Sequence, residues 1–339
     1  MKAERTRIGF IGAGGIANRH LGNLLGFDDV QVVALADLEL DRAREAAARC
    51  EATAYADHAE MLGRERLDAV YLCVPPFAHG APEAAAIERG LPFFVEKPLA
   101  IDLETAEAVA RRVQERGLVT AAGYHWRYLD ITERAQALLR ATPARLALGY
   151  WLDSTPPPRW WTREAQSGGQ TVEQTTHIFD LARLLVGEVT GVSASAARTA
   201  RAAHPDADVA DVSVATLQFA SGALGSVAST CLLGWPHRIG LHLFGEGLAI
   251  EISEFDLMVD VGQGRPVQRA EGDPFVREDR DFIDAVQGKP NTIRVPYAEA
   301  LETHRLVTAA ARSAREGRPI ALRPDTSGAD LGRVSGAVA

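Results

Sequence analysis

Two separate stretches of the sequence carry side chains suited to proton transfer. The first is Glu96-Lys97-Pro98, which directly follows the short apolar run Leu91–Val95. Such a run is typical of a buried strand, and in an open parallel α/β sheet ligands bind at the carboxyl ends of the strands. Lys97 is therefore expected where a ligand would bind, although a surface lysine after a strand gives the same pattern. Pro98 restricts the backbone of Lys97 and permits a cis peptide bond.

The second stretch contains an acid, a histidine and another acid at helical spacing. Thr171-Val172-Glu173-Gln174 matches a capping box, with Thr171 as N-cap of a helix that runs to about Val186. On that helix Glu173, His177 and Asp180 would share one face. Histidine exchanges protons near neutral pH, and either acid could orient its ring. A solvated Glu–His pair fits the same spacing, and without a third ligand at recognisable spacing we predict no metal site.

A glycine-rich turn lies between the first expected strand and helix. Ile8–Ile11 reads as a strand, and a helical pattern through Leu25 begins after the turn. In a G-x-G-x-x-A turn, glycines permit the bend and the approach of a pyrophosphate, and alanine allows close helix–strand packing. The helix N-terminus offers free N–H groups to the phosphates. The residues expected at this dinucleotide site are Gly12, Gly14, Gly15, Ile16 and Ala17.

An acid follows the second expected strand, Val30–Ala36. At this place Asp37 can accept hydrogen bonds from ribose hydroxyls, and together with Glu39 it would repel a 2′-phosphate. The nearest arginine is Arg42. We therefore predict NAD as the cofactor and consider NADP disfavoured. Asp37 could also cap the following helix, which is compatible with the same position.

The order of expected elements divides the chain into two domains and a tail. Strands alternate with helices over residues 1–122, which predicts a doubly wound parallel sheet and an NAD-binding domain. Over residues 123–322 the pattern is strand-rich, with hairpin turns near residues 221 and 246, which indicates an α+β domain with a large, mainly antiparallel sheet. Residues 323–339 are polar and rich in Gly and Ser, and we expect a flexible tail.

Two segments of the second domain could form the walls of a substrate pocket. One contains Tyr124, His125 and Arg127, an unusual density of polar-tipped side chains. The other is the proline-rich loop 155–163 with two adjacent tryptophans, of which Trp161 is the candidate wall residue. Tryptophans in such a loop either pack beneath it or form a wall against a sugar face or an apolar ring.

Bulk composition excludes several classes of protein. The net charge of −9 disfavours nucleic acid or an anionic membrane surface as a partner. There is no run of about 18 apolar residues, so we predict no membrane span. The three cysteines, with no signal-peptide layout at the start, fit the reducing cytoplasm.

Five motifs together resemble the glucose–fructose oxidoreductase/inositol dehydrogenase (Gfo/Idh/MocA) family. They occur in the family's order and cover nearly the whole chain, and Glu-Lys-Pro combined with the later histidine is the most specific part. The motifs are Gly12-Ala13-Gly14-Gly15-Ile16-Ala17, Cys73-Val74-Pro75-Pro76-Phe77-Ala78-His79, Val95-Glu96-Lys97-Pro98-Leu99-Ala100, Gly123-Tyr124-His125-Trp126-Arg127-Tyr128, and Gly168-Gly169 with Glu173, His177 and Asp180.

The resemblance implies a Rossmann domain followed by a domain with a large open sheet that often mediates oligomerisation. A homodimer or homotetramer through that sheet is the expected assembly. The implied activity is metal-free hydride transfer at a secondary alcohol of a sugar, polyol or related carbonyl compound. The family's catalytic lysine and histidine fall on Lys97 and His177, and the residues expected beside the cofactor are Val74, Pro75, His79, Glu96 and Lys97.

The sequence departs from the family's pattern where the substrate should bind. Glu173 stands where many members carry Asp, and His125 and Trp126 stand where many carry Asn or Arg. The substrate of better-known members is therefore not carried over. Two alternatives stay open: a reductase of an imine, a bilin or an unsaturated diol, and a non-catalytic NAD sensor. The intact pair of Lys97 and His177 favours alcohol chemistry, but the sequence does not decide which of the two transfers the proton.

Overall fold

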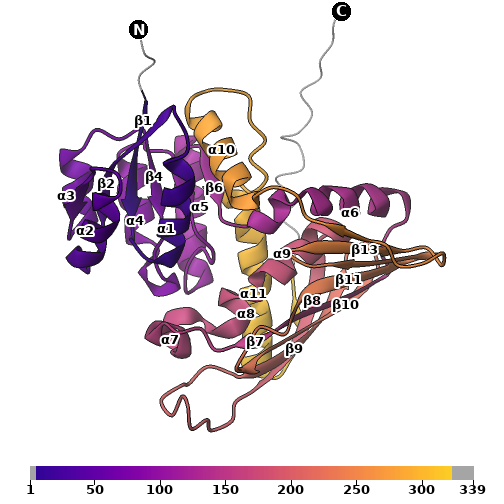
Figure 1. The fold of residues 1–339 in the computed structure, drawn as a ribbon. Coiled ribbons are helices and arrows are strands. Elements are labelled where there is room, and N and C mark those ends of the chain that lie inside the picture. The colour runs from indigo at the N-terminus through magenta and orange to yellow at the C-terminus, as the bar shows by residue number, and fades with distance from the viewer. Residues whose placement is uncertain (1–4, 323–339) are drawn as a thin grey trace, which may run out of the picture.

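The computed structural model describes residues 5–322, which form two sheets side by side (Figure 1). The first sheet has six parallel strands in the order β3-β2-β1-β4-β5-β6. The strand order reverses between β1 and β4, and ligands bind at such a switch point. This sheet confirms the predicted doubly wound fold. Its strands are β1 Thr6–Ile11, β2 Val30–Ala36, β3 Thr53–Tyr55, β4 Ala69–Leu72, β5 Phe93–Val95 and β6 Thr120–Ala122.

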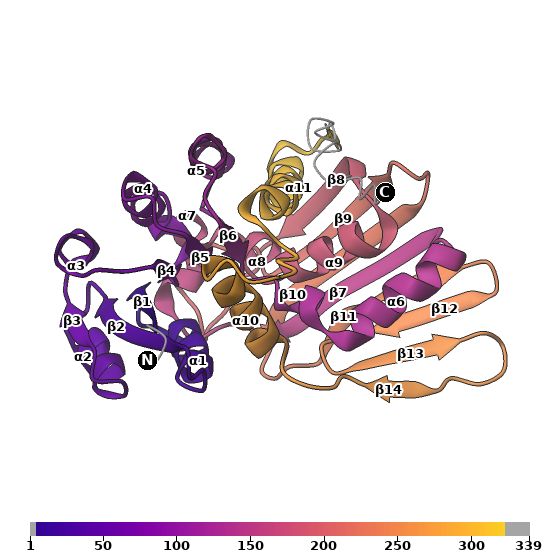
Figure 2. The ribbon, with the colours of Figure 1, turned by 90° about the horizontal axis from the view of Figure 1, so that it is seen from above.

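Helices cover both faces of the first sheet (Figure 2). Each face has its own apolar core, as a parallel sheet buried on both sides requires. The helical segments of this region are α1 Gly15–Leu24, α2 Leu40–Ala48, α3 His58–Arg64, the 3₁₀ turn η1 Pro76–Ala78, α4 Ala81–Glu88 and α5 Leu103–Arg116.

The second sheet has nine strands in the order β14-β13-β12-β11-β7-β10-β9-β8-β15. Its neighbours pair antiparallel except β7 and β10, which are parallel. The mainly antiparallel sheet predicted for this region is confirmed. Its strands are β7 Leu146–Ser154, β8 Val189–Ala197, β9 Val212–Phe219, β10 Leu224–Leu233, β11 Arg238–Gly245, β12 Leu248–Ile252, β13 Asp256–Asp260, β14 Val267–Arg269 and β15 Ile320–Ala321.

One face of the second sheet packs against α6 Asp130–Ala141, α9 Thr176–Val186 and α11 Tyr297–Glu316. Alternate strand side chains join those helices in the largest apolar core. The opposite face exposes apolar side chains, which are Leu146, Leu148, Val214 and Leu224. No helix within residues 5–322 is long and apolar enough to cross a lipid bilayer.

Helix α10, Pro274–Val286, connects the two regions. It follows β14 in sequence but packs against α1, and Phe282 and Ile283 belong to a core of the first sheet. The domain boundary near residue 122 stays a proposal. Helix α10, which lies far beyond this boundary in sequence, packs against the first sheet's region. The predicted tail, residues 323–339, lies outside the described residues.

The single helix predicted from Thr171 to Val186 is wrong. The chain forms two helices here, α8 Gly169–Glu173 and then α9, which starts at Thr176. The Thr171 hydroxyl bonds to Ser213 on β9 instead of capping a helix. A long-range hydrogen bond therefore replaced the local cap, and Glu173 and His177 belong to different helices. The remaining short elements are η2 His125–Tyr128, η3 Arg159–Thr162 and α7 Glu164–Ser167.

Candidate active site

A cavity of about 1280 Å³ lies at the carboxyl ends of the strands of the first sheet. One end is formed by the glycine turn and the ends of β1, β2 and β4, and the other by residues that follow β5 and β6 and by parts of the second domain. The predicted site residues on its wall are Gly12, Gly14, Gly15, Ile16, Asp37, Val74, Pro75, Glu96, Lys97, His125, Glu173 and His177.

The glycine turn has the backbone that a bound pyrophosphate needs. Gly12 has φ 93°, and a Cβ there would collide with the carbonyl of Cys73. Gly14 and Gly15 have open space where a side chain would stand, and α1 starts at Gly15. The free N–H groups of the helix N-terminus therefore border the cavity. Ala17 lies behind this surface, 1% exposed, in the core between α1 and the sheet.

Asp37 is fixed at the end of β2. Its carboxylate accepts hydrogen bonds from the backbone N–H groups of Ala13, at 2.9 Å, and Glu39, at 2.8 Å. The acid thus stands beside the glycine turn and on the cavity wall, where it fits the ribose of an adenine dinucleotide. His79 differs from the expectation, because it is turned inward to Glu83, with 2.6 Å between Nδ1 and Oε1, and does not line this cavity.

Lys97 follows β5, and its peptide bond to Pro98 is cis. Its Nζ donates to the carbonyl of Glu173, at 2.8 Å, and to Oε1 of the same residue, at 2.9 Å. The other carboxylate oxygen of Glu173 accepts from Trp161 Nε1 at 2.7 Å. Glu173 therefore orients Lys97, and Trp161 orients Glu173. Trp161 lies beneath its loop, 1% exposed, and its neighbour Trp160 lines the cavity.

The ring of His177 is enclosed by aromatic side chains. Tyr124 and His125 meet it edge-on, with ring centroids 5.7 and 5.0 Å away, and Trp126 and Trp151 stack near it at 6.5 and 5.9 Å. Burial, together with the charges of Lys97 and His125, holds the pKa of His177 well below its ordinary value. Its Nδ1 is buried without a hydrogen-bond partner. His177 is therefore a neutral imidazole at neutral pH on the cavity wall.

Neither acid proposed to orient His177 bonds to its ring. Asp180 accepts two hydrogen bonds from Arg127, both 2.7 Å long, and one from Thr303. Arg127 also bonds to Glu299. Arg127 and Asp180 are 5% and 1% exposed and do not line the cavity. The geometry thus makes them a buried pair that connects η2, α9 and α11, where the sequence suggested a pocket wall at Arg127 and a partner of His177 at Asp180.

Tyr124 is fully buried and shares a hydrogen bond with Thr176 at 2.9 Å. His125 does reach the cavity and stacks on Phe275, with ring centroids 4.0 Å apart. Its Nε2 lies 3.2 Å from Glu254.

The sequence did not reveal Phe275 and Trp151 as site residues, because each lies far along the chain from the motif that it supports. Trp160 was visible as the neighbour of a candidate residue.

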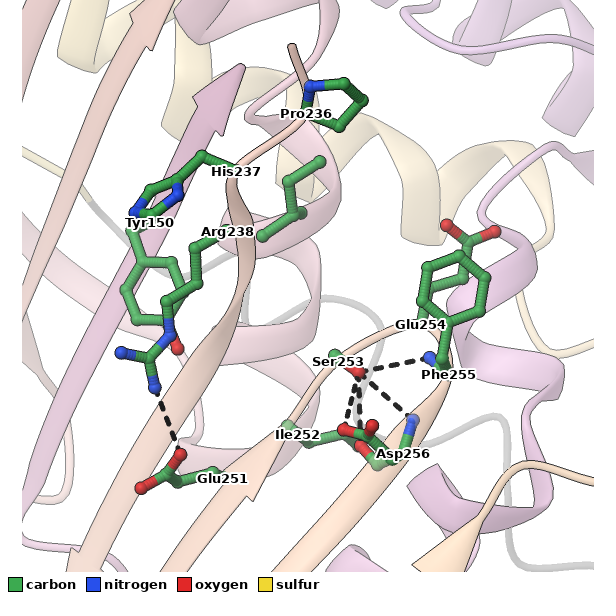
Figure 3. A pocket seen from close by; sticks show the side chains of 11 residues that line it. Tyr150, Pro236, His237, Arg238, Glu251, Ile252, Ser253, Glu254, Phe255 and Asp256 are labelled. Atoms are coloured by element: carbon green, nitrogen blue, oxygen red, sulfur yellow. Dashed lines mark hydrogen bonds and ion pairs between the residues drawn. The ribbon is translucent and has the colours of Figure 1, made fainter.

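A second cavity, of about 400 Å³, lies at one end of the second sheet (Figure 3). Arg238 covers the ring of Tyr150, 4.9 Å from its centroid, and forms an ion pair with Glu251. Glu254, which also lines this cavity, bonds to His125 of the first. Arg238, Glu251, Glu254 and Asp256 of the second cavity thus all have charged partners, inside or outside it. The glycine turn and Asp37 border the first cavity.

Two protein-family models match the chain. The oxidoreductase family with an NAD-binding Rossmann fold matches residues 6–124, and the GFO/IDH/MocA C-terminal domain matches residues 142–251. A myo-inositol 2-dehydrogenase of Thermotoga maritima is 30% identical over 241 residues, which are 69% of this chain and 71% of that protein. The scyllo-inositol 2-dehydrogenase (NAD(+)) of Bacillus subtilis is 26% identical over 94% of this chain and 97% of its own.

Solved structures share the fold over nearly the whole chain. Levoglucosan dehydrogenase in complex with NADH has a TM-score of 0.82 at 21% identity, over 94% of this chain and all of that one. The WlbA dehydrogenase from Bordetella pertussis, in complex with NADH and UDP-GlcNAcA, has a TM-score of 0.82 at 24% identity, over 95% of this chain and all of that one.

The fold, the glycine turn and these relatives define the protein as an NAD-dependent oxidoreductase. The chain belongs to the GFO/IDH/MocA family.

Proposed function

We propose that the protein transfers a hydride between NAD and a secondary alcohol or ketone of a sugar, cyclitol or sugar acid. One observation supports this most strongly: Lys97 and His177 come from different domains to the same cavity that carries the glycine turn. The inositol dehydrogenases among its relatives favour a polyhydroxylated substrate. Bound NAD would supply the hydride acceptor.

The side chains divide the remaining work. We propose that neutral His177 accepts the hydroxyl proton, because its lowered pKa leaves the ring uncharged at neutral pH. The ammonium group of Lys97, held by Glu173, would stabilise the negative charge that develops on the same oxygen. His125, Phe275 and Trp160 are the groups best placed to select the substrate's shape.

Absorbance of NADH at 340 nm tests this proposal. The protein is mixed with NAD and a panel of cyclitols, aldoses and sugar acids, and the same panel is repeated with NADP. We expect turnover with at least one polyol, and with NAD above NADP. Clear NAD binding without turnover on any compound would contradict the proposal and favour the sensor alternative.

We also propose that two or four copies associate through the open face of the second sheet, in the cytoplasm. The exposed side chains of Leu146, Leu148, Val214 and Leu224 lie on adjacent strands, and contiguous apolar surface of this kind marks interaction sites. Light scattering during size-exclusion chromatography should give a mass above 36.4 kDa, which Leu148→Asp should lower. A monomeric wild-type protein would refute this assembly.

A further inference from the structure

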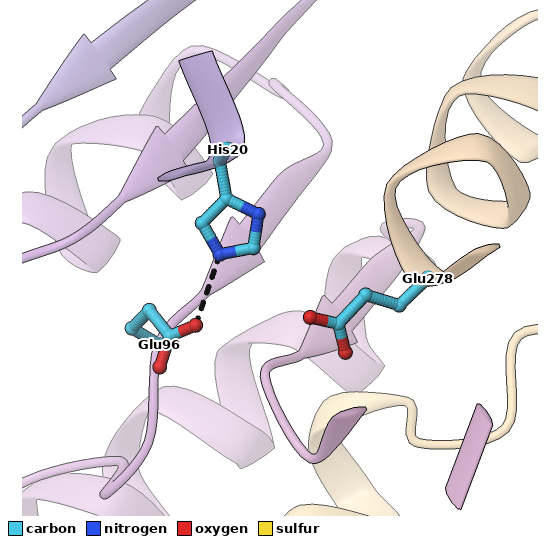
Figure 4. Close-up of side chains that lie close together, drawn as sticks. All are labelled: His20, Glu96 and Glu278. Carbon is cyan, nitrogen blue, oxygen red and sulfur yellow. Dashed lines mark hydrogen bonds and ion pairs between the residues drawn. The ribbon is translucent and has the colours of Figure 1, made fainter. Parts of the chain in front are cut away.

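A histidine outside the sequence motifs lies buried behind Glu96-Lys97-Pro98, here named the catalytic turn. His20 is on α1, the helix that starts at the glycine turn, and is fully buried. Its Nδ1 lies 2.7 Å from an oxygen of Asp279 on α10, and its Nε2 lies 3.0 Å from an oxygen of Glu96. Figure 4 shows the ring directed at Glu96, with Glu278 facing the pair. One ring therefore connects α1, α10 and the turn that carries Lys97.

The charges of the cluster formed by His20, Glu96, Glu278 and Asp279 favour hydrogen bonds from both ring nitrogens of His20. Burial opposes a charge on the ring, but Asp279 and Glu96 together hold the pKa of His20 well above its ordinary value. His20 is thus an imidazolium that donates from both nitrogens, and hydrogen bonds between charged groups are the strong ones. Burial, aided by Glu96 and Asp279, raises the pKa of Glu278, and neither of its oxygens has a hydrogen-bond partner. A neutral Glu278 leaves one cation between two carboxylates.

The carboxylate of Glu96 is fixed on its other side by the catalytic turn. Its Oε2 accepts a hydrogen bond from the backbone N–H of Lys97 at 3.1 Å. A Cβ on Gly123 would collide with this carboxylate, so the chain after β6 closes tightly over it. Glu96 lines the cavity, although it is only 4% exposed. Any rotation of Glu96 would therefore break the bond that fixes the backbone of Lys97.

The ring of His20 is itself held in place. Asp279 accepts a second hydrogen bond, at 2.8 Å, from Asn23 one turn further along α1. Phe94, Tyr71 and Phe275 contact the ring, with centroids 4.8, 5.4 and 5.9 Å away. The position and orientation of the imidazolium are thus set by packing as well as by charge.

We propose that His20 is a positioning residue, which acts through Glu96 to place Lys97 relative to the phosphate-binding helix. This rests on the proposed role of Lys97 in hydride transfer. The N-terminus of helix α1 borders the cavity where the pyrophosphate would bind, and α1 carries His20 on its second turn, so one rigid element would place both the pyrophosphate and the catalytic turn. Small displacements of a reacting group are costly in turnover, which gives the connection a catalytic consequence.

The first test compares buried histidines. His20→Phe keeps a ring in the aromatic packing and removes both hydrogen bonds, and we expect kcat to fall about tenfold with the Kd for NAD within about threefold of wild type. His20→Gln can still donate to Glu96 and should restore part of the loss. The control is His304→Phe, at a fully buried histidine on α11 whose ring Nε2 lies 3.2 Å from the Asp102 carbonyl oxygen. It should leave kcat unchanged even where it lowers Tm.

The second test asks whether His20 acts through Glu96. The turnover of His20→Phe/Glu96→Gln should be no lower than that of Glu96→Gln alone, because coupled residues are not additive. The proposal would be overturned if the fold-losses of kcat in the two single variants multiplied in the double variant. An unchanged kcat in His20→Phe would also overturn it. So would a stoichiometric metal that is lost in His20→Phe, since atoms of His20, Glu96 and Glu278 lie within 4.8 Å of one another.

A crystal structure of His20→Phe separates this proposal from the proposed function, because it needs no substrate. We expect the Lys97 backbone to move away from Glu96 and the Lys97–Glu173 bond to lengthen or break. An unchanged Lys97 would refute the positioning role even if the enzyme is active. Absence of turnover in the wild-type protein, combined with a displaced Lys97 in the variant, would refute only the proposed function.

Discussion

The two ends of the active-site cavity are built in different ways. At the cofactor end, Gly12, Gly14 and Asp37 come from one continuous βαβ segment and offer backbone N–H groups and one fixed carboxylate. At the substrate end, Lys97 and His177 come from separate domains, and each depends on side chains distant in sequence. The cofactor end is thus a local structure, whereas the substrate end exists only in the folded whole. Variants should therefore separate binding of NAD from chemistry.

The largest separation is expected at the catalytic pair. Lys97→Ala and His177→Ala should each lower kcat by about 10²-fold or more, because charge stabilisation or proton transfer is lost. The Kd for NAD, measured by titration calorimetry, should stay within a few-fold of wild type, since the glycine turn and Asp37 are untouched. Near-normal turnover in either variant would remove that residue from the mechanism.

The converse separation is expected at Asp37. Asp37→Ser should weaken NAD binding by about tenfold and narrow the preference for NAD over NADP, because the bonds to the ribose and the repulsion of a 2′-phosphate are both lost. The control is Asp41→Ser, since Asp41 is fully exposed on α2. kcat at saturating NAD should stay close to wild type. Unchanged relative affinities for the two dinucleotides would show that Asp37 does not select the cofactor.

A smaller effect is expected from the side chain beneath the loop. Trp161→Phe keeps the packing but removes the donor to Glu173, which leaves a partly buried carboxylate oxygen without this donor. kcat should fall several-fold, with unchanged affinity for NAD. Trp160→Phe alters the cavity wall instead and should change the KM for substrate more than kcat. If the two variants changed kcat and KM in the same way, the assignment of Trp161 as a support of Glu173 and of Trp160 as a cavity wall would not hold.

The smallest effect is a displacement of the pH profile. Because the pKa of His177 lies well below the usual 6.5, alcohol oxidation should stay active below pH 6.5 and decline only as the falling pH protonates this ring. His125→Asn removes one cause of the low pKa of His177, so the acid limb of the plot of kcat against pH should move to higher pH. An acid limb at or above pH 6.5 in the wild-type enzyme would contradict a buried, neutral His177.

The sequence was most informative about local structure. The glycine turn, Asp37 and the two sheet types were predictable, because each is signalled by residues within one strand–turn–helix unit or by strand periodicity. The strand end and the helical spacing singled out Lys97 and His177, but only the resemblance to a family paired them as catalytic residues. The break between α8 and α9 was not predicted, and the Thr171 hydroxyl that was expected to cap a helix bonds instead to a distant strand.

The partners of the catalytic residues could not be predicted either. Asp180 bonds to Arg127, and Glu173 bonds to Lys97 and Trp161, whereas the spacing suggested that one or the other acid orients His177. Several acids and bases compete for each partner in the folded protein, and only the packing of distant segments decides between them. His20 is the extreme case, because its two partners lie 76 and 259 residues away.

Transfer of deuterium from substrate to cofactor is the sharpest test of hydride transfer in this cavity. A substrate found in the polyol panel is labelled with deuterium on the carbon that carries the reacting hydroxyl, and the reduced cofactor is examined by NMR. We expect one deuterium on the nicotinamide ring per turnover of the wild-type enzyme. His177→Ala and Lys97→Ala should not form this product at wild-type rates. Reduced NAD without deuterium would contradict hydride transfer from a secondary alcohol in this cavity.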